Sequence, residues 1–535
     1  MKITALLIFI CMLTMQINAQ TNIIDINDIE AFINNNGTIS FEDEESHFEV
    51  PKGSGDHTIF AGQVWMGGID DGGQLHVAAQ TYRQSGDDFW AGPIADDYTA
   101  SVYADTYERV WIIDKASIED HKLNWDEGGY IVPDAIIDWP GNGNTTNGEA
   151  EFLAPFYDYN VNEIYDPENG DYPIIRGDEA LFFIMNDDAN EHTESEGEKL
   201  GVEIHGMAYA FDTPSADTAL FQTLFLHYEI INRSANNYND FYTGTWFDFD
   251  IGCWTDDWVG CDSSLNLFYA YNGDVNDEPC PGGYDSYPPA QGAVWLNENL
   301  SSFIYYNNDY TVIGNPENAD DYYNYLKATW KDDLHVTYGG DGYGGVDETN
   351  FMFPSDPLDE DGWSELTETN APADRRGVGA TGPFLLQPGQ SLCYDIALPF
   401  AFRDGTGHLE MISVLRQRTQ DVIDFYSTNF SVCKIENETN PDFDTTLSVE
   451  QEVLIGVEVF PNPAKNNITI DLGNSFLMRD AKIEILNTVG EILISKENIA
   501  GNSITINDLL LPQGLYFYNL KEANSIIASG SFTVQ

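Results

Sequence analysis

A run of oxygen-bearing side chains with regular spacing begins at Asp158. Asp158, Asn160, Asn162 and Asp166 occupy positions 1, 3, 5 and 9 of this run, and Ile164 offers its backbone carbonyl at position 7. Calcium loops supply their oxygen ligands in this order, and Ca²⁺ takes about six to eight of them. The spacing therefore predicts a calcium site.

The run departs from the calcium pattern at two positions. Glu163 stands at position 6, where glycine usually makes the sharp turn, and Asn169 stands at position 12, where a glutamate usually binds with both oxygens. Asp171 follows closely and can supply a carboxylate instead. The alternative is an acidic turn that holds no metal.

A second acidic cluster begins at Asp248. Asp248 and Asp250 are two residues apart on a strand-like segment, so both carboxylates project from the same face. Two adjacent carboxylates repel each other, and the pKa of one rises unless a cation lies between them. The following segment, which we predict to be a loop, can complete an oxygen shell around Ca²⁺ with Asp256, Asp257 and Asp262. The alternative is a set of aspartates that are solvated or that cap backbone N–H groups.

Motifs of the common hydrolase and nucleotide-binding classes are absent. The sequence has no His-Glu-x-x-His, no Gly-x-Ser-x-Gly and no phosphate loop. A carboxylate pair such as Asp248 and Asp250 could serve a glycosidase, but a carboxylate that binds calcium is not free to transfer protons. His205 and His227 fall in adjacent predicted strands, where histidines are more often structural.

The chain is rich in aromatic residues, which make up 13% of its sequence. In a β-rich chain such residues mostly fill the core. The alternative is stacking against sugars, for which three side chains near the second acidic cluster are candidates: Trp246, Trp254 and Trp258.

The charge of the chain is strongly negative and unevenly distributed. The net charge of the 535 residues is −67, whereas the segment from Glu452 to the end holds five basic and nine acidic residues. Such a field repels nucleic acids and anionic membranes and attracts divalent cations. The alternative cause is a solvated acidic surface suited to a saline habitat. The contrast also predicts a domain boundary near residue 450.

Both ends of the chain carry features of export. Residues 1–19 combine Lys2, a short apolar run and a small residue before Gln20, which is typical of a secretory signal peptide. No later stretch approaches the roughly 20 apolar residues of a transmembrane helix. We therefore expect a soluble mature protein that passes through the periplasm.

Six cysteines are present, and Cys11 lies in the signal peptide. An oxidising export route permits disulfides among the other five, and their odd number leaves at least one thiol unpaired. Our hypothesis is one bridge among Cys253, Cys261 and Cys280, and a second between Cys393 and Cys433.

The body of the chain has the patterns of β-strands. Residues 58–68 and 74–82 flank Asp-Asp-Gly-Gly, which predicts a hairpin. Residues 201–211 and 219–232 predict a long antiparallel pair, the second strand being apolar on both faces.

Two further segments complete the body. One helix is predicted over residues 408–426, where apolar residues recur at helical spacing. Residues 20–55 are polar and acidic, which predicts a loose lead-in.

The C-terminal stretch contains short alternating segments after Phe460-Pro461-Asn462-Pro463, and it includes Gly514-Leu515-Tyr516 and a final apolar strand. These patterns predict a small antiparallel sandwich. The stretch resembles the type A C-terminal sorting domain of the type IX, or Por, secretion system of the Bacteroidetes. This resemblance implies an immunoglobulin-like sandwich read by the outer-membrane translocon, removal by a sortase-like peptidase, and attachment of the cargo to surface lipopolysaccharide. In the body, the stretch from Trp246 to Asn266 occurs together with Asp171-Tyr-Pro and Asp88-Phe-Trp-Ala-Gly-Pro. This combination resembles a family of large exported Bacteroidetes proteins, which implies no activity.

We therefore predict a mostly β protein: an antiparallel, β-sandwich-rich body with one clear helix, followed by a C-terminal immunoglobulin-like sandwich. The predicted divisions are a signal peptide (1–19), a body of one or two domains (20–436), a linker (437–451) and a sorting domain (452–535). We expect an exported surface or extracellular protein whose body is a non-catalytic, calcium-stabilised binding or adhesion module for a glycan or protein. The alternative is a secreted hydrolase of polysaccharide or protein.

Overall fold

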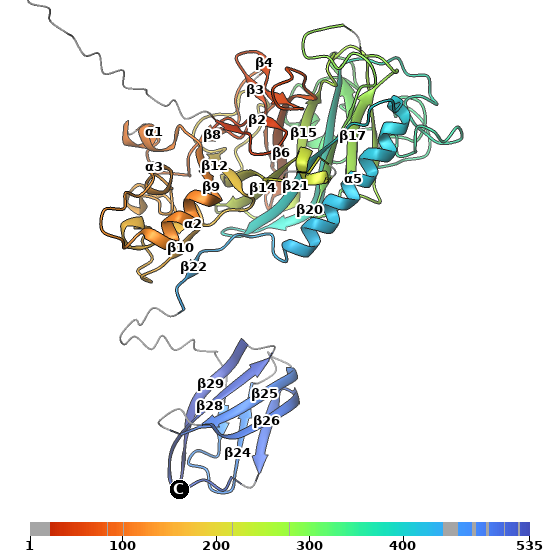
Figure 1. The fold of residues 1–535 in the computed structure, drawn as a ribbon. Coiled ribbons are helices and arrows are strands. Elements are labelled where there is room, and N and C mark those ends of the chain that lie inside the picture. Colours follow the sequence, from red (N-terminus) through yellow and green to blue (C-terminus); the bar gives the residue numbers. More distant parts are fainter. Residues whose placement is uncertain are drawn as a thin grey trace, which may run out of the picture. The chain divides into compact units, whose positions relative to one another are not determined.

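The computed structural model describes residues 22–82, 84–99, 101–213, 215–216, 218–277, 279–441, 458–472, 478–487, 492–507, 509–522 and 525–535. The chain divides into two units, Met1–Phe443, called the body below, and Asp444–Gln535, called the C-terminal unit. The predicted signal peptide and residues 442–451 of the predicted linker lie outside the described residues. Strands dominate both units, as the sequence predicts (Figure 1).

A five-stranded antiparallel sheet forms one layer of the body. Its strands, in spatial order, are β19 (Ser302–Asn307), β20 (Arg375–Leu386), β15 (Tyr238–Phe249), β6 (Ile59–Asp70) and β7 (Leu75–Ala79). β6 and β7 form the predicted hairpin.

A nine-stranded antiparallel sheet forms the second layer. Its strands, in spatial order, are β16 (Asp257–Asp262), β17 (Leu267–Asn272), β18 (Ala290–Trp295), β21 (Ser391–Ala401), β14 (Thr223–Asn232), β13 (Val202–Ala210), β12 (Glu179–Asn186) and β8 (Trp90–Ala91), and β9 (Trp111–Asp114) also pairs with β12. The central pair β13 and β14 is the predicted antiparallel pair. β14 is shorter than predicted, because residues 219–222 form a 3₁₀ turn (η3, Ala219–Gln222).

The two sheets pack face to face, and the nine-stranded sheet is buried on both faces. Phe247 of β15 lies 6.1 Å from Phe268 of β17, measured between ring centroids, in the core between the layers. Along β14, Leu226 and Tyr228 belong to that core, whereas Phe225 belongs to a second core on the opposite face. The alternation follows from the two-residue period of a strand.

The outer face of the nine-stranded sheet is covered by the predicted helix, α5 (His408–Asn429), which contacts β17, β18 and β21 (Figure 1). Met411, Leu415 and Val422 bury one stripe of this helix in the second core. The described residues include four shorter helices that the sequence patterns did not indicate: α1 (Ser101–Tyr107), α2 (Lys115–Asn124), α3 (Asp134–Ile137) and α4 (Ala319–Leu326).

The N-terminal segment is not the loose lead-in that the sequence suggested. Residues 23–49 form five short strands: β1 (Ile23–Ile24), β2 (Glu30–Phe32), β3 (Phe41–Glu42), β4 (Glu45–Ser46) and β5 (Phe48–Glu49). Ile24, Ile33 and Phe48 are buried in the core between the layers. Single apolar residues, scattered among acidic ones, anchor this segment in the core. Because its strands are only two or three residues long, the sequence shows no strand periodicity there.

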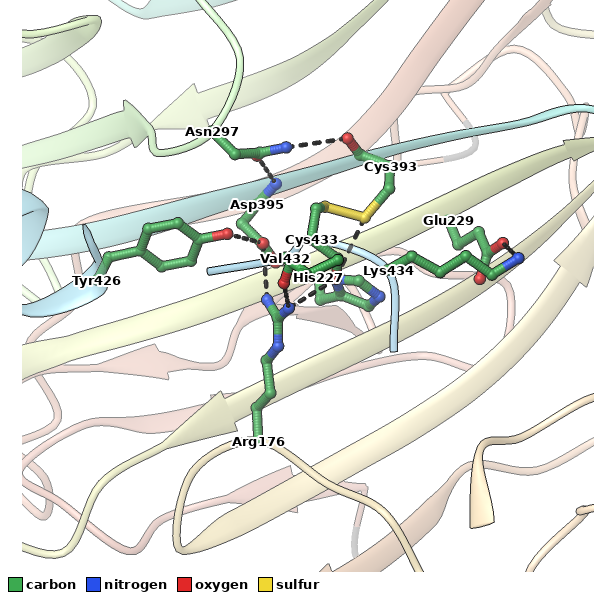
Figure 2. Close-up of a disulfide and its surroundings, with 10 residues drawn as sticks. All are labelled: Arg176, His227, Glu229, Asn297, Cys393, Asp395, Tyr426, Val432, Cys433 and Lys434. Atoms are coloured by element: carbon green, nitrogen blue, oxygen red, sulfur yellow. Dashed lines mark hydrogen bonds and ion pairs between the residues drawn. A yellow bond between two sulfur atoms is a disulfide. The ribbon is translucent and has the colours of Figure 1, made fainter. Parts of the chain in front are cut away.

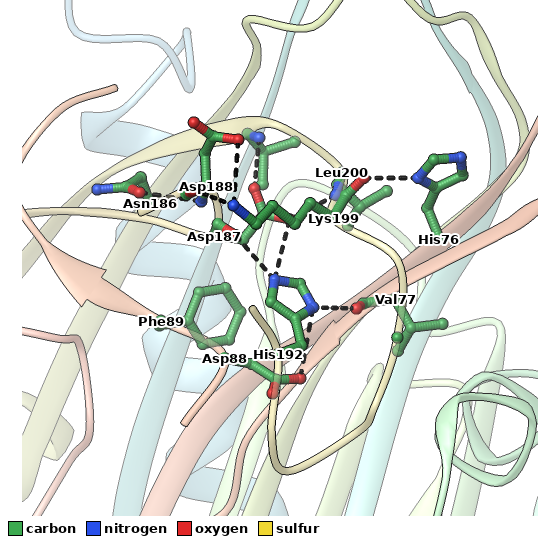
Figure 3. Close-up of polar contacts among 12 residues, drawn as sticks. His76, Val77, Asp88, Phe89, Asn186, Asp187, Asp188, His192, Lys199 and Leu200 are labelled. Carbon is green, nitrogen blue, oxygen red and sulfur yellow. Dashed lines mark hydrogen bonds and ion pairs between the residues drawn. The ribbon is translucent and has the colours of Figure 1, made fainter. Parts of the chain in front are cut away.

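A polar cluster fixes the loop between β12 and β13 (Figure 3). The ring nitrogens of His192 lie 2.7 Å from the carbonyl oxygen of Val77 and 2.8 Å from that of Asp187. Both ring nitrogens thus face backbone carbonyl oxygens, and the carboxylates of Asp88 and Asp187 lie 3.8 and 3.6 Å from the ring. The loop is thus held against β7.

The C-terminal unit consists of two antiparallel sheets around its own core. One sheet contains β23 (Glu458–Phe460), β24 (Asn467–Asp471) and β27 (Ser503–Asn507), and the other contains β26 (Ile492–Gly501), β25 (Met478–Leu486), β28 (Gly514–Glu522) and β29 (Ser525–Val534). Ile468, Ile483 and Phe532 are buried between the sheets. This is the predicted immunoglobulin-like sandwich.

Candidate functional site

The predicted calcium loop connects two short strands of the body. β10 (Phe156–Asp158) pairs antiparallel with β11 (Tyr172–Pro173) and parallel with β22 (Glu438–Thr439), so the two ends of the loop are held together. Within the loop, η2 (Pro167–Asn169) forms a single 3₁₀ turn. Asp158 and Asp171 are both buried where the loop begins and ends.

Asp158 shapes the first half of the loop. Its carboxylate accepts hydrogen bonds from the backbone N–H groups of Asn162 (3.2 Å) and Glu163 (2.8 Å). Glu163 has a φ of 64°, so it adopts the left-handed conformation for which glycine is usual at this position. The sequence departure at Glu163 therefore leaves the turn itself intact.

Asp166 collects the side-chain amides of the loop. Its carboxylate accepts hydrogen bonds from Asn160 (3.1 Å), Asn162 (3.1 Å) and Asn169 (2.8 Å). The Oδ1 atom of Asn160 is buried, and none of the described residues donates a hydrogen bond to it. A half-turn of each amide would present oxygens to the same point, and these oxygens are ligands that Ca²⁺ accepts.

Asp171 closes the loop. Its two oxygens accept hydrogen bonds from the N–H groups of Tyr159 and Asp166, both at 2.8 Å. Burial, with a further contribution from the neighbouring Asp166 carboxyl, raises the pKa of Asp171 to about 7. Ile164 donates its N–H to Asn162 and exposes its side chain, and its carbonyl oxygen is the atom that a calcium loop would use.

The second acidic cluster lies on the face of β15 that points away from the nine-stranded sheet. Carboxylate oxygens of Asp248, Asp250 and Asp374 lie within 4.8 Å of one another. Asp374 directly precedes β20, whose Arg376 is the register partner of Asp248. The sequence did not indicate Asp374, because its proximity depends on this pairing between strands that are distant in sequence.

Arg376 supplies the positive charge of this cluster. Its guanidinium lies 3.2 Å from an oxygen of Asp248 and 3.7 Å from one of Asp374, and it is itself buried. Burial raises the pKa of Asp248 to about 7, with Arg376 opposing the rise and Asp374 adding to it. Burial and the neighbouring carboxylates of Asp248 and Asp374 raise the pKa of Asp250 well above its usual range. With all three carboxyls ionised, the cluster would hold more negative charge than Arg376 can neutralise, and protonation or a cation would relieve the excess.

The three later aspartates do not join this cluster. β16 runs from Asp257 to Asp262, so the predicted loop is a strand that separates its two ends by about 17 Å. Asp262 pairs with Arg416 (3.0 Å), and Asp257 accepts a hydrogen bond from the N–H of Ile251 (2.9 Å). Asp256 lies near Asp277 instead. One ion cannot bind all five aspartates that the sequence suggested.

The sugar-stacking candidates differ in exposure. Trp246 and Trp258 are buried, whereas the side chain of Trp254 is 53% exposed. The first two serve the core, and only Trp254 presents its ring to solvent.

A cavity of about 520 Å³ lies on the outer face of the nine-stranded sheet. His205 and His227 line it from adjacent strands. Asp158 and Glu163 line it from the predicted calcium loop, residues 158–171, which is called the acidic loop below. A disulfide, Cys393–Cys433, ties the segment after α5 to β21 beside the cavity (Figure 2). The other bridge is Cys253–Cys280, and Cys261 is a buried free thiol, which agrees with our hypothesis for the pairing.

Comparison with known proteins identifies the C-terminal unit. Residues 458–532 match the family described as the secretion system C-terminal sorting domain. The unit is a type IX sorting domain, and the chain is a cargo that this system delivers to the cell surface or the medium. Within the described part of the chain, no helix combines the length and the apolar character needed to cross a membrane.

Comparisons of the whole chain say less. No curated protein matches it. A polysaccharide lyase aligns with 62% of this chain at 8% identity and a TM-score of 0.18, and dimeric latent PorU from Porphyromonas gingivalis aligns with 66% at 11% identity and a TM-score of 0.12. These alignments span 34% and 31% of the two solved chains, about a third of each.

Proposed function

We propose that the exported body is a non-catalytic binding or adhesion module whose loops are stabilised by calcium. The observation that carries this proposal is the acidic loop, in which hydrogen bonds link Asp158, Asp166 and Asp171 and the amides of Asn160 and Asn162 within 14 residues of sequence. Calcium held there would fix a loop between strands, where recognition surfaces commonly lie.

The cluster of Asp248, Asp250 and Asp374 is the second proposed cation site. Asp250 is only 7% exposed and accepts no side-chain hydrogen bond among the described residues. A buried carboxylate without donors is costly unless it is protonated or faces a cation. Ca²⁺ would supply that charge, with Arg376 retaining its contact with Asp248.

A hydrolase that uses Asp248 and Asp250 as acid and base is less well supported. Both side chains are buried, and Arg376 bonds to one of them. A glycosidase needs two carboxyl groups that can reach a sugar between them. We expect the purified chain to hydrolyse neither polysaccharide nor peptide. Turnover that Asp250→Asn abolishes without unfolding the chain would establish the hydrolase instead.

Thermal unfolding with and without a calcium chelator tests the calcium proposal. An ion that binds only the folded state stabilises it by about 2.7 kcal/mol at a hundredfold excess over its Kd. Chelation should therefore lower the Tm of the wild-type body, and Asp158→Ala should reduce that effect. Asp212→Ala, a substitution at an exposed position outside both clusters, is the matched control and should keep the full response. An unchanged Tm on chelation would contradict the proposal.

For the C-terminal unit, we propose that a sortase-like peptidase removes it after export and attaches the body to surface lipopolysaccharide. Support comes from the sorting-domain match. Mass spectrometry of the exported protein should find a new C-terminus before the sandwich. An intact C-terminus on the exported protein would contradict cleavage.

A further inference from the structure

The cavity on the outer face of the nine-stranded sheet has a floor of rigidly held polar side chains. The Nδ1 atom of His227 lies 2.9 Å from a carboxylate oxygen of Asp395, which is fully buried. Asp395 also accepts hydrogen bonds from Arg176 (2.7 Å) and from the hydroxyl of Tyr426 (Figure 2). Within the part of the chain that the structure describes, no group bonds the second ring nitrogen of His227, which is left for a ligand.

His205 is held in the same manner. Its Nε2 atom lies 2.9 Å from a carboxylate oxygen of Glu203, and Arg233 lies 2.7 Å from the same oxygen. Burial opposes ionisation of Glu203, but His205 and Arg233 outweigh it and lower the pKa of this carboxyl to about 2. The floor therefore offers two imidazoles, each with one nitrogen engaged by a carboxylate and one left for a ligand.

The charges around this floor are paired. Glu203 pairs with Arg233, Asp395 with Arg176, and Glu229 with Lys434 at 2.9 Å. Asp158, Glu163 and Glu436 also line the cavity, without a basic partner among the described residues. An anionic ligand would meet this acidic lining in a protein of net charge −67. A polar ligand without net charge avoids this repulsion and leaves the ion pairs beneath the floor intact.

The walls are aromatic. Phe152, Phe156 and Phe182 line the cavity, and the side chain of Phe152 is 39% exposed. The ring of Phe182 meets that of His205 edge to face, with centroids 6.1 Å apart. Apolar ring faces beside fixed hydrogen-bonding groups suit a molecule with C–H faces and many hydroxyls.

We infer that this cavity binds a short neutral oligosaccharide. Its volume of about 520 Å³ lies within the range of about 300–1,000 Å³ typical of ligand sites. A sugar ring would stack on the exposed ring of Phe152, and its hydroxyls would bond to His205 and His227. This inference rests on the proposed binding function and gives that function a site and a ligand class.

Calorimetric titration of the purified chain tests this inference. The probes are short linear oligomers of glucose, xylose and mannose, and oligogalacturonates of equal length as the anionic comparison. We expect at least one neutral oligomer to bind and the oligogalacturonates not to bind. Binding of the oligogalacturonates alone, or of no probe, would overturn the inference.

Two variants locate the site. Phe152→Ala should weaken binding by about tenfold or more, because a stacking surface is lost. Phe402→Ala is the matched control, since Phe402 is 40% exposed and does not line the cavity, and it should bind as the wild type does. Equal affinities of the wild type and Phe152→Ala would overturn the inference. His227→Gln should also weaken binding. If His227→Gln does not fold, the result for Phe152→Ala decides the test.

The calcium proposal and this inference can fail separately. The titrations are repeated with chelator, and the Tm is recorded on the same samples. A Tm that does not change with chelator would contradict the calcium proposal and would not affect the oligosaccharide inference. Binding that is lost with chelator would link the acidic loop, which lines the cavity, to its occupancy.

Discussion

Asp166 and Asp171 show how a short turn can bring two carboxyl groups together. The N–H of Asp166 donates to Asp171, which places the Asp166 carboxyl beside it. Burial and this neighbour raise the pKa of Asp171 to about 7, so at neutral pH a proton and a cation compete for the same oxygens. The loop is thus a place where pH and metal affect folding through one residue.

We expect Asp171 to make the stability of the metal-free body fall as the pH rises from about 4 to about 7. The folded state keeps the proton of Asp171 throughout this range, whereas the unfolded chain loses it near pH 4. Because the native state binds more protons, its free energy of unfolding decreases as the pH rises. Saturating calcium should remove this decline.

Urea denaturation of the wild type and Asp171→Asn at several pH values, with chelator, checks this expectation. The asparagine cannot ionise, so the difference in unfolding free energy between the two proteins should change across the range. Parallel pH profiles would show that Asp171 does not titrate as argued.

Arg376 is the residue on which the Asp248 cluster depends. We expect Arg376→Met to lower the free energy of unfolding by roughly 3–5 kcal/mol, because it leaves buried carboxylates without their counter-charge. Arg109→Met is the control, because its partner Asp138 is half exposed, and it should cost less than about 1 kcal/mol. Similar losses of unfolding free energy in both variants would mean that the buried ion pair of Arg376 contributes no more to stability than the exposed pair of Arg109.

At the scale of elements, the sequence predicts segments whose patterns are local and long. The apolar runs of β13 and β14, the turn between β6 and β7 and the apolar stripe of α5 each lie within one segment, and each predicted element is present. Among the short helices, α2 buries only Ile118 and His121, so it lacks a helical apolar stripe that a sequence pattern could reveal.

The candidate site was predictable only in part for a related reason. The candidate calcium ligands of the acidic loop lie within 14 residues of sequence, so their spacing is visible. Asp374 reaches Asp248 only through the register of β15 and β20, in which Asp248 pairs with Arg376. No local pattern specifies that register, and the paired carboxylates beneath the cavity likewise come from separate strands.

The disulfide Cys393–Cys433 should keep residues 434–439, which form one side of the cavity, in place. It closes a loop of 40 residues, and in the chain-entropy account its removal costs about 4 kcal/mol. We expect the double Cys→Ser variant to be destabilised and residues 434–439 to lose hydrogen-exchange protection before the strands do. Hydrogen exchange monitored by mass spectrometry measures this.

The second bridge provides the matched control for that experiment. Cys253–Cys280 spans 27 residues, and neither of its cysteines lines the cavity. Its double Cys→Ser variant should lose stability by a similar amount and leave exchange at 434–439 unchanged. Equal exchange at that segment in both variants would contradict a local role for Cys393–Cys433.

At the scale of the whole molecule, charge and folding divide in the same region of the chain. Most of the net charge of −67 lies before residue 452, and the C-terminal unit has a separate hydrophobic core. A body with so much negative charge repels itself, and cations relieve that repulsion. Calcium bound at buried carboxylates would act in the same direction as the salt of the surroundings.

The separate core of the C-terminal unit leads to a prediction about export. Deleting residues 452–535 removes that core and no residue of the two cores of the body, so the body should fold and remain in the periplasm. Fractionation of cells that have the type IX system measures its location. The truncated chain in the medium at the wild-type level would contradict the sorting role.

Point variants test whether export requires the C-terminal unit to be folded or only its sequence to be present. Ile483 is fully buried in the C-terminal unit, and Leu510 is 92% exposed. Ile483→Asp places a charge in the core, should unfold the unit and should retain the chain as the deletion does. Leu510→Asp adds the same charge at the surface and should be exported normally. If the translocon recognises a folded surface, only the first variant stays inside the cell; export of both would mean that a linear segment is sufficient.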